Sequence, residues 1–282
     1  MNLSSAFHLS NPPNDMIVTS VADEVYLKYV YVLLKSLYAT NPKMPIHVRL
    51  VGMADAGYRK QNELLKINPN VTVTFDYTEL DSTKNRFPIP NSKWDWAGES
   101  IQTFHPKLVS DKMCHCVQVK YNDISNLLDK GYEAVFSVDS DTIIRKDLTA
   151  LRNIIDRYDV TIMDHITEDS VMYDRKRAGW KEGAIGVKNT SKSRQFFDKV
   201  NDFIDEYGPS HPAGWVVEDK AICAAYEQVS ISRGHLPRTF KDETYDDDTF
   251  IWSGTGTNKF KNEKYKEEMK KYENSDSNPA DE

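Results

Sequence analysis

Long apolar runs are missing from this chain of 282 residues. No stretch approaches the roughly 18 to 20 apolar residues that a membrane-spanning helix needs, and the first residues lack the basic start and apolar core of a secretory signal. Cysteine is also scarce, since Cys114, Cys116 and Cys223 are too few for a disulfide framework. We therefore expect a soluble protein of the reducing cytoplasm.

Basic residues are not in excess either. Lys and Arg total 36 against 43 Asp and Glu, which gives a net charge of -7. This balance opposes general attraction to nucleic acid or to anionic membranes, so a phosphate-bearing ligand has to be held locally, by a divalent cation or a few lysines. No internal repeat is present. We expect one domain over residues 1–262, followed over 263–282 by a charged helix and disordered tail, a terminus that is exposed to solvent.

Hydrophobic periodicity predicts alternating strands and helices. The predicted strands cover residues 15–22, 45–52, 71–77, 134–138, 159–164 and 183–189, and the predicted helices cover residues 26–40, 54–67, 107–130, 148–158, 191–207 and 218–228. This order favours an α/β fold with a mostly parallel sheet flanked by helices. Residues 80–103 are rich in Pro, Asn, Trp and Gly, and they are predicted to form a long loop that helps cover a substrate.

The acidic triplet Asp139-Ser140-Asp141 follows the most apolar predicted strand. If the strand continued through it, Asp139 and Asp141 would share a face, at the carboxyl end of a strand, where ligands of parallel sheets collect. Neighbouring carboxylates repel each other unless a cation or proton lies between them, and hard oxygen ligands suit Mg²⁺ or Mn²⁺. The alternative is a pair of aspartates that merely cap a turn and contact solvent.

A second candidate ligand segment is SGTGTNK, residues 253–259. Gly254 and Gly256 would let backbone N–H groups approach a phosphate closely, and Lys259 would balance negative charge on a departing diphosphate. By itself the pattern also fits a Gly/Thr loop before a helix.

Four segments in this order resemble the GT-A fold glycosyltransferases, most closely those of family 8, which includes glycogenin and bacterial galactosyltransferases, and their phage-type relatives. The segments begin at residues 17, 119, 183 and 251, and together they span most of residues 15–262. The resemblance implies a GT-A fold, a nucleotide-sugar donor, with UDP favoured, and a divalent cation at a DxD motif formed by Asp139 and Asp141.

The resemblance also assigns binding residues. It places Thr19, Ser20, Ala22 and Tyr26 at a loop that cradles the nucleotide base, and it places Lys120 where relatives carry an arginine that faces the donor. Relatives end on a His-x-x-Gly-x-x-Lys pattern, in which the His binds metal and the Lys meets the diphosphate. Gly256 and Lys259 match this pattern, but Ser253 stands in the position of the His, which leaves the third protein ligand open.

The catalytic group on the sugar has two interpretations. Glu218 and Asp219 open a predicted helix, where acidic residues are also favoured by the helix dipole. Asp219-Lys220 takes the place of a family 8 Asp-Gln pair beside the donor sugar, which suits retention of anomeric configuration. Alternatively, GWVVED resembles a motif of inverting galactosyltransferases whose acidic residue deprotonates the acceptor. Asp164-His165 is a further candidate pair near the sugar.

The favoured function is therefore metal-dependent transfer of a hexose from a nucleotide-sugar, with retention slightly ahead of inversion. A sugar nucleotidyltransferase is the main alternative, although the Gly-rich, Arg-bearing signature of that class is missing after the first strand. A catalytically inactive sugar-binding relative is the third hypothesis, because Ser253 replaces the metal-binding His.

Overall fold

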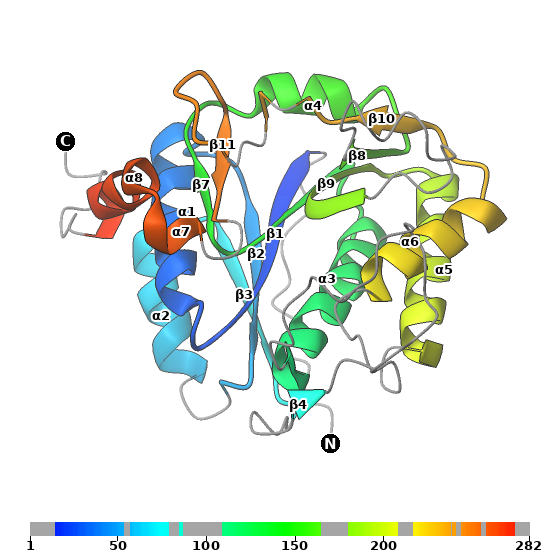
Figure 1. The fold of residues 1–282 in the computed structure, drawn as a ribbon, viewed down its shortest axis with the longest axis horizontal. Helices are drawn as coiled ribbons and strands as arrows, with labels where there is room; N and C mark the ends of the chain where they lie inside the picture. Colours follow the sequence, from blue (N-terminus) through cyan, green and yellow to red (C-terminus); the bar gives the residue numbers. More distant parts are fainter. Residues whose placement is uncertain are drawn as a thin grey trace.

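A computed structural model of the protein describes residues 15–53, 57–78, 85–86, 109–164, 180–207, 217–237, 239–240, 244–254 and 258–273. Its centre is a seven-stranded sheet with the strand order β10-β8-β9-β6-β1-β2-β3, which Figure 1 shows between two layers of helices. In chain order these strands are β1 (Met16–Asp23), β2 (Ile46–Val51), β3 (Val71–Asp76), β6 (Ala134–Val138), β8 (Val160–Asp164), β9 (Trp180–Lys188) and β10 (Arg233–His235).

The sheet is mostly parallel. β1 pairs in parallel with β2 and β6, β2 with β3, and β8 with β10, whereas β9 runs antiparallel between β6 and β8. The apolar runs of β1 and β6 are buried throughout or nearly so, as strands covered on both faces require. The predicted α/β class and mostly parallel sheet are confirmed.

Helices cover both faces of the sheet. They are α1 (Leu27–Thr40), α2 (Gly57–Ile67), α3 (Asp111–Asp129), α4 (Thr149–Ile155), α5 (Ser191–Tyr207), α6 (Val217–Gln228), α7 (Asn258–Lys261) and α8 (Glu263–Glu273). One core cluster joins the sheet to α1, α2 and α4, and a second joins its other face to α3, α5 and α6. Figure 1 shows α1 and α2 on one side of the sheet and α3, α5 and α6 on the other.

A small two-stranded sheet stands beside the main one. In it β7 (Thr142–Ile144) pairs antiparallel with β11 (Ile251–Ser253), so that Thr142 lies opposite Ser253. A third buried cluster lies behind this pair and is formed by α1, α8 and the residues around β11. A separate short pair, β4 (Asn85–Arg86) with β5 (Val109–Ser110), precedes α3.

The local structure differs from the sequence-based expectations in three places. Residues 85–86 and 109–110 pair as strands inside segments expected to be loop and helix. Asp139, Ser140 and Asp141 do not continue the strand, because β6 ends at Val138 and the triplet forms a turn that leads into β7. The charged C-terminal helix is not simply solvated: Tyr265 and Met269 of α8 are buried against α1, because an apolar stripe runs along this otherwise charged helix.

Candidate active site

The acidic turn lies where β6 leaves the central sheet. The backbone N–H of Asp139 donates to the carbonyl of Gly183, which ties the turn to β9. Asp139 is half-buried, whereas Ser140 and Asp141 are buried. The predicted position at the carboxyl end of an interior strand is therefore correct, although the shared-face argument for the two carboxylates is not, since both belong to a turn.

Lys259 reaches Asp141 from α7. Its Nζ lies 2.6 Å from Asp141 Oδ2 and 3.1 Å from the hydroxyl of Tyr26. The ammonium also lies over two aromatic rings, 4.4 Å from the centroid of Tyr26 and 5.2 Å from that of Tyr29. Burial acts to lower the pKa of Lys259, but the charge of Asp141 and the hydrogen bonds to Asp141 and Tyr26 together hold that pKa above its ordinary value. The structure thus joins three sequence-predicted ligand residues in one buried cluster.

The backbone of Asp141 is held from two directions. Its carbonyl oxygen accepts the N–H of Gly254 at 3.0 Å and the hydroxyl of Tyr265 at 2.6 Å. A Cβ on residue 254 would lie 2.8 Å from the Tyr265 hydroxyl and 3.0 Å from the Asp141 carboxylate. Glycine is therefore required at 254 for this close approach.

Lys120 and Glu218 form a second ion pair between α3 and α6. Lys120 of α3 forms an ion pair with Glu218 in the first turn of α6, and the hydroxyl of Tyr121 donates to the same carboxylate oxygen at 2.8 Å. Burial raises the pKa of Glu218, and the negative charge of Asp139 adds to that rise while Lys120 opposes it. Glu218 is therefore close enough to the acidic turn to feel its charge.

The residues assigned to the base-binding loop divide into two groups. Thr19, Ser20 and Ala22 lie inside β1, which continues to Asp23, and all three are buried. Thr19 contacts His47 of β2 at 3.2 Å. These three residues thus belong to the predicted first strand, which runs on to Asp23, and their contact with a nucleotide base stays a prediction. Tyr26, at the end of the turn after β1, does reach the acidic cluster through Lys259.

Some predicted residues lie partly or wholly outside the described structure. Gly256 and His165 are outside it altogether, and Asp219, Lys220 and Asp164 are placed only as backbone positions in α6 and β8. Ser253, in the place of the family His, is buried on β11 beside Thr142. It therefore lies next to the acidic turn, as the resemblance implied for that position.

The side chains at the acidic turn determine which kind of cation could bind there. Within the described ranges, no group of three or more His, Cys, Asp or Glu side chains is arranged to hold a metal ion. Two carboxylates in one turn match Mg²⁺, which commonly takes one or two carboxylates and completes its shell with substrate phosphates and water. The residues present fit an ion that is shared with a diphosphate, rather than one caged by protein alone.

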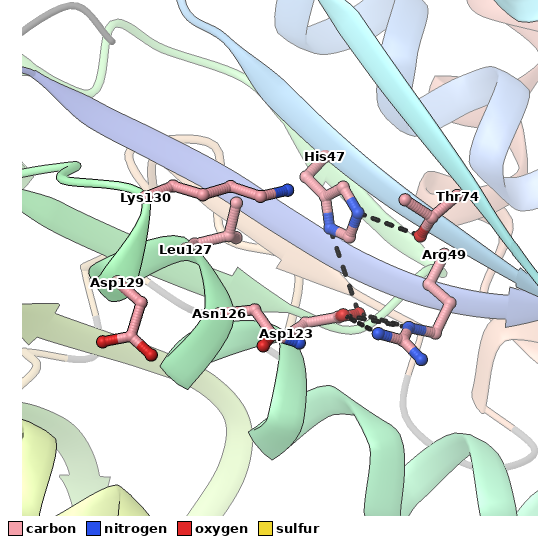
Figure 2. A pocket seen from close by; sticks show the side chains of 8 residues that line it. All are labelled: His47, Arg49, Thr74, Asp123, Asn126, Leu127, Asp129 and Lys130. Atoms are coloured by element: carbon pink, nitrogen blue, oxygen red, sulfur yellow. Dashed lines mark hydrogen bonds and ion pairs between the residues drawn. The ribbon is translucent and has the colours of Figure 1, made fainter. Parts of the chain in front are cut away.

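A polar cavity of about 360 Å³ lies elsewhere, under α3 and against β2 and β3. Figure 2 shows Arg49 against the carboxylate of Asp123, with the ring of His47 beside Thr74. Arg49 binds both Asp123 and Asp76, and His47 bridges Thr19 and Thr74. Through Thr19 of β1, His47 lies level with Ser137 near the end of β6. The residues that line this cavity include none of the acidic turn, and inside it Arg49 pairs with Asp123.

Sequence reasoning missed the aromatic support of the turn. Tyr29 and Tyr265 were not among the predicted site residues, yet both contact the Asp141–Lys259 pair. For Tyr265 a signal was available, because Tyr265, Met269 and Tyr272 recur at the spacing of one helical face within a charged segment.

Residues 65–275 match the family model of the nucleotide-diphospho-sugar transferases. The match covers most of the chain, so the protein belongs to this family. A search among curated proteins found no significant match.

Solved glycosyltransferase structures share the fold. The chain resembles the glycosyltransferase GlyE of Streptococcus pneumoniae TIGR4 with a TM-score of 0.56 and 12% identity, over 93% of this chain and 62% of that one. It resembles the galactosyltransferase LgtC, crystallised with donor and acceptor sugar analogues, with a TM-score of 0.50 and 14% identity, over 86% and 87% of the two chains. Mouse xyloside xylosyltransferase 1 gives a TM-score of 0.50 and 12% identity, over 87% and 99%.

The matching family model describes nucleotide-diphospho-sugar transferases, and the solved structures share the fold of the chain. The predicted GT-A glycosyltransferase fold is confirmed by these likenesses. The chain spans less than two thirds of the length of GlyE. Within the described ranges, no helix has the length and apolar character needed to span a membrane.

Proposed function

We propose that the protein transfers a hexose from a nucleoside diphosphate sugar, with UDP favoured as the nucleotide, to an acceptor hydroxyl. Asp139 and Asp141 are the proposed ligands of a Mg²⁺ or Mn²⁺ ion that is shared with the donor diphosphate. The observation that carries this proposal is the pair formed by Asp141 and Lys259, with Nζ and Oδ2 2.6 Å apart at the end of an interior strand. In this pair a carboxylate, which can bind a metal ion, and a lysine, which can bind phosphate, lie next to each other, and this supports the proposed binding of a metal diphosphate.

Each group in the cluster has a separate role in the proposed reaction. A metal ion bound at the turn supplies positive charge to the diphosphate. Lys259 stabilises the negative charge that develops on the departing nucleoside diphosphate, and Tyr26 orients its ammonium. Gly254 leaves room for the ligand-binding turn to approach β11 closely.

Lys120 is the second proposed cation for the diphosphate. The carboxylate of Glu218, which is 6% exposed, already accepts hydrogen bonds from Lys120 and Tyr121. Both contacts are made to one oxygen, Oε2, and they hold the buried carboxylate in place. We assign Glu218 the role of positioning Lys120, and Asp219 with Lys220 remains the proposed group beside the sugar.

We favour retention of the anomeric configuration, because Asp219-Lys220 takes the place of the family 8 Asp-Gln pair beside the donor sugar. Proton NMR of the first-formed product distinguishes the two outcomes directly, because the coupling constant of the anomeric proton reports its configuration. A product with inverted configuration would contradict the retaining proposal and would return Glu218 or Asp219 to the role of base.

The decisive experiment is a thermal-shift panel of nucleotide-sugars with and without Mn²⁺ and Mg²⁺. A donor that stabilises the protein only with metal identifies both the ligand class and the ion, since a ligand that binds the folded state raises its stability. Asp141→Asn and Asp139→Asn should abolish the metal-dependent shift. Asp129→Asn, at the exposed end of α3, is the matched control and should keep it. A full shift in both site variants would contradict the proposal.

Product analysis separates the alternatives. Release of the nucleoside diphosphate supports sugar transfer, whereas release of pyrophosphate supports a sugar nucleotidyltransferase. The buried Ser253 in the place of the metal-binding His is the observation that favours the third hypothesis, an inactive sugar-binding relative. Sugar binding that is unchanged by EDTA, together with no nucleotide release from any donor, would support that hypothesis.

A further inference from the structure

Two buried tyrosines stand directly behind the acidic turn and β11. The hydroxyl of Tyr265 donates to the backbone oxygen of Asp141 at 2.6 Å, and the hydroxyl of Tyr245 donates to that of Ser253 at 3.2 Å. Their ring centroids are 5.3 Å apart, and neither residue is more than 1% exposed. Asp141 is a proposed metal ligand and Ser253 stands in the place of the family His, so the two tyrosines anchor the backbone of two positions of the proposed metal site.

We propose that Tyr265, assisted by Tyr245, is a positioning residue: it fixes the backbone of Asp141 and so orients the Asp141 carboxylate toward a metal diphosphate. This inference rests on the proposed function. It assigns a role in donor binding to α8, the segment that the sequence pattern presented as a solvated tail.

The hydroxyl of Tyr265 completes the hydrogen bonding of the Asp141 carbonyl. A carbonyl oxygen accepts two hydrogen bonds, and here Gly254 and Tyr265 fill both positions. The residue that carries the carboxylate is therefore fixed by its backbone before any ligand arrives. Lys259 holds the side chain from the other direction, so Asp141 is constrained at both ends.

The anchoring helix is itself fixed. Tyr265 and Met269 pack with Tyr29 and Val32 of α1, and Lys35 of α1 donates to the carbonyl of Tyr272 at 2.8 Å. Figure 1 shows α8 and α7 beside α1, on the side where β7 and β11 lie. A rigid helix at this place gives the phenol a defined position, which is what a residue acting through the backbone of another needs.

The backbone of Tyr245 is in a strained conformation, which the surrounding residues have to maintain. Its φ of 63° lies in the left-handed region, which is unusual for a bulky aromatic residue. The residue is held there by the rings of Trp252, at 5.6 Å, and Tyr265. Surrounding packing has to maintain such a conformation, and here that packing is the cluster that backs the turn.

The test compares Tyr265→Phe with Met269→Ala in the full chain. Tyr265→Phe removes only the hydroxyl, whereas Met269→Ala opens a cavity in the same cluster without touching the turn. Calorimetry measures the Kd of the nucleoside diphosphate that binds the wild-type protein, tested from UDP onward, in Mg²⁺. We expect roughly tenfold weaker binding by Tyr265→Phe, the size of one buried hydrogen bond, and a change within about twofold for Met269→Ala, despite its larger fall in Tm.

A second measurement needs no ligand. Hydrogen exchange of the backbone amides of residues 139–144 and 251–254 should accelerate in Tyr265→Phe, because the carbonyl of Asp141 loses one of its two donors. Tyr245→Phe should act in the same direction but less strongly, since its hydrogen bond is longer. Under the same conditions, turnover with a donor sugar should show a raised KM with kcat changed by less than about threefold.

The outcomes separate the two proposals. Binding and exchange in Tyr265→Phe that equal the wild type would overturn the positioning role and leave the proposed function standing. Equal losses in Tyr265→Phe and Met269→Ala would also overturn it, because they would show only general loosening of α8. Failure of the wild-type protein to bind any nucleoside diphosphate would overturn the proposed function and this inference with it.

Discussion

Lys259 and Asp141 form an ion pair that is nearly closed to solvent. The two charged atoms are 2.6 Å apart, and the side chains are 5% and 10% exposed. A metal ion bound as proposed would compete with this lysine for the carboxylate of Asp141. We therefore predict that the stability of the ligand-free protein and its response to metal depend on the same pair.

Replacement of this lysine should make the protein more responsive to metal. Lys259→Met leaves the carboxylate of Asp141 buried without its cation, and breaking a buried pair in this way costs about 3–5 kcal/mol of the free energy of unfolding. Added Mn²⁺ or Mg²⁺ should recover part of this loss, so the metal-induced rise in Tm should exceed that of the wild type. Thermal denaturation with and without EDTA measures it.

The control is Lys261→Met, at an exposed position on the same short helix. It should match the wild type in Tm and in metal response. If Lys259→Met showed no larger metal response than this control, the idea that the ammonium and the metal share one carboxylate would be wrong.

Glu218→Gln distinguishes a positioning residue from a catalytic base. The amide keeps the shape of the side chain but removes the charge that holds Lys120. We expect kcat/KM to fall about tenfold, since the side chain of Lys120 would lose its fixed position. A general base typically contributes 10²–10⁴-fold, so a loss above a thousandfold, with donor affinity unchanged, would instead identify Glu218 as the base. Steady-state kinetics on the active donor provides the measurement.

Gly254→Ala should be destabilising in a way that a second substitution partly repairs. The added methyl would lie 2.8 Å from the hydroxyl of Tyr265 and 3.0 Å from Asp141 Oδ2, and overpacking of this kind costs about 1–3 kcal/mol. Tyr265→Phe removes the nearest clashing atom. The double variant should therefore lose less stability than the sum of the single variants, as denaturant unfolding would show. Strict additivity would mean that the methyl and the phenol do not crowd each other.

The buried imidazole of His47 makes stability depend on pH. Burial lowers its pKa from the ordinary 6.5, and the charges of Lys130 and Arg49 act in the same direction while Asp123 opposes them. The unfolded chain therefore binds the proton more readily than the folded one. This contribution to stability is present above about pH 6.5 and is lost as the pH falls through the folded pKa.

We expect Tm to fall between pH 7 and pH 5, and the slope to be smaller in His47→Gln, whose amide does not titrate. His235→Gln, at an exposed position on β10, is the control and should keep the slope of the wild type. A slope that is the same in all three proteins would assign the pH dependence to other groups.

The sequence determined most of the strands and helices of the main sheet and its two helical layers. Strands such as Ala134–Val138 and helices such as Ser191–Tyr207 follow from local hydrophobic periodicity, which depends on neighbours in the chain. The acidic triplet and Lys259 were also identifiable, because paired carboxylates and a lysine after glycines have a chemistry of their own. Their roles in binding remain predictions.

Tertiary structure decided how these groups meet. The pairing of β7 with β11 brings Ser253 opposite Thr142 although the two lie far apart in the chain, and no local pattern encodes that contact. The sequence predicted Glu218 as an acidic residue at the start of a helix. Its ion pair with Lys120 and its hydrogen bond from Tyr121, however, depend on how α6 packs near α3. The burial of Tyr265 likewise depends on where α8 docks, because a mostly charged helix becomes part of a core only when another surface covers its apolar stripe.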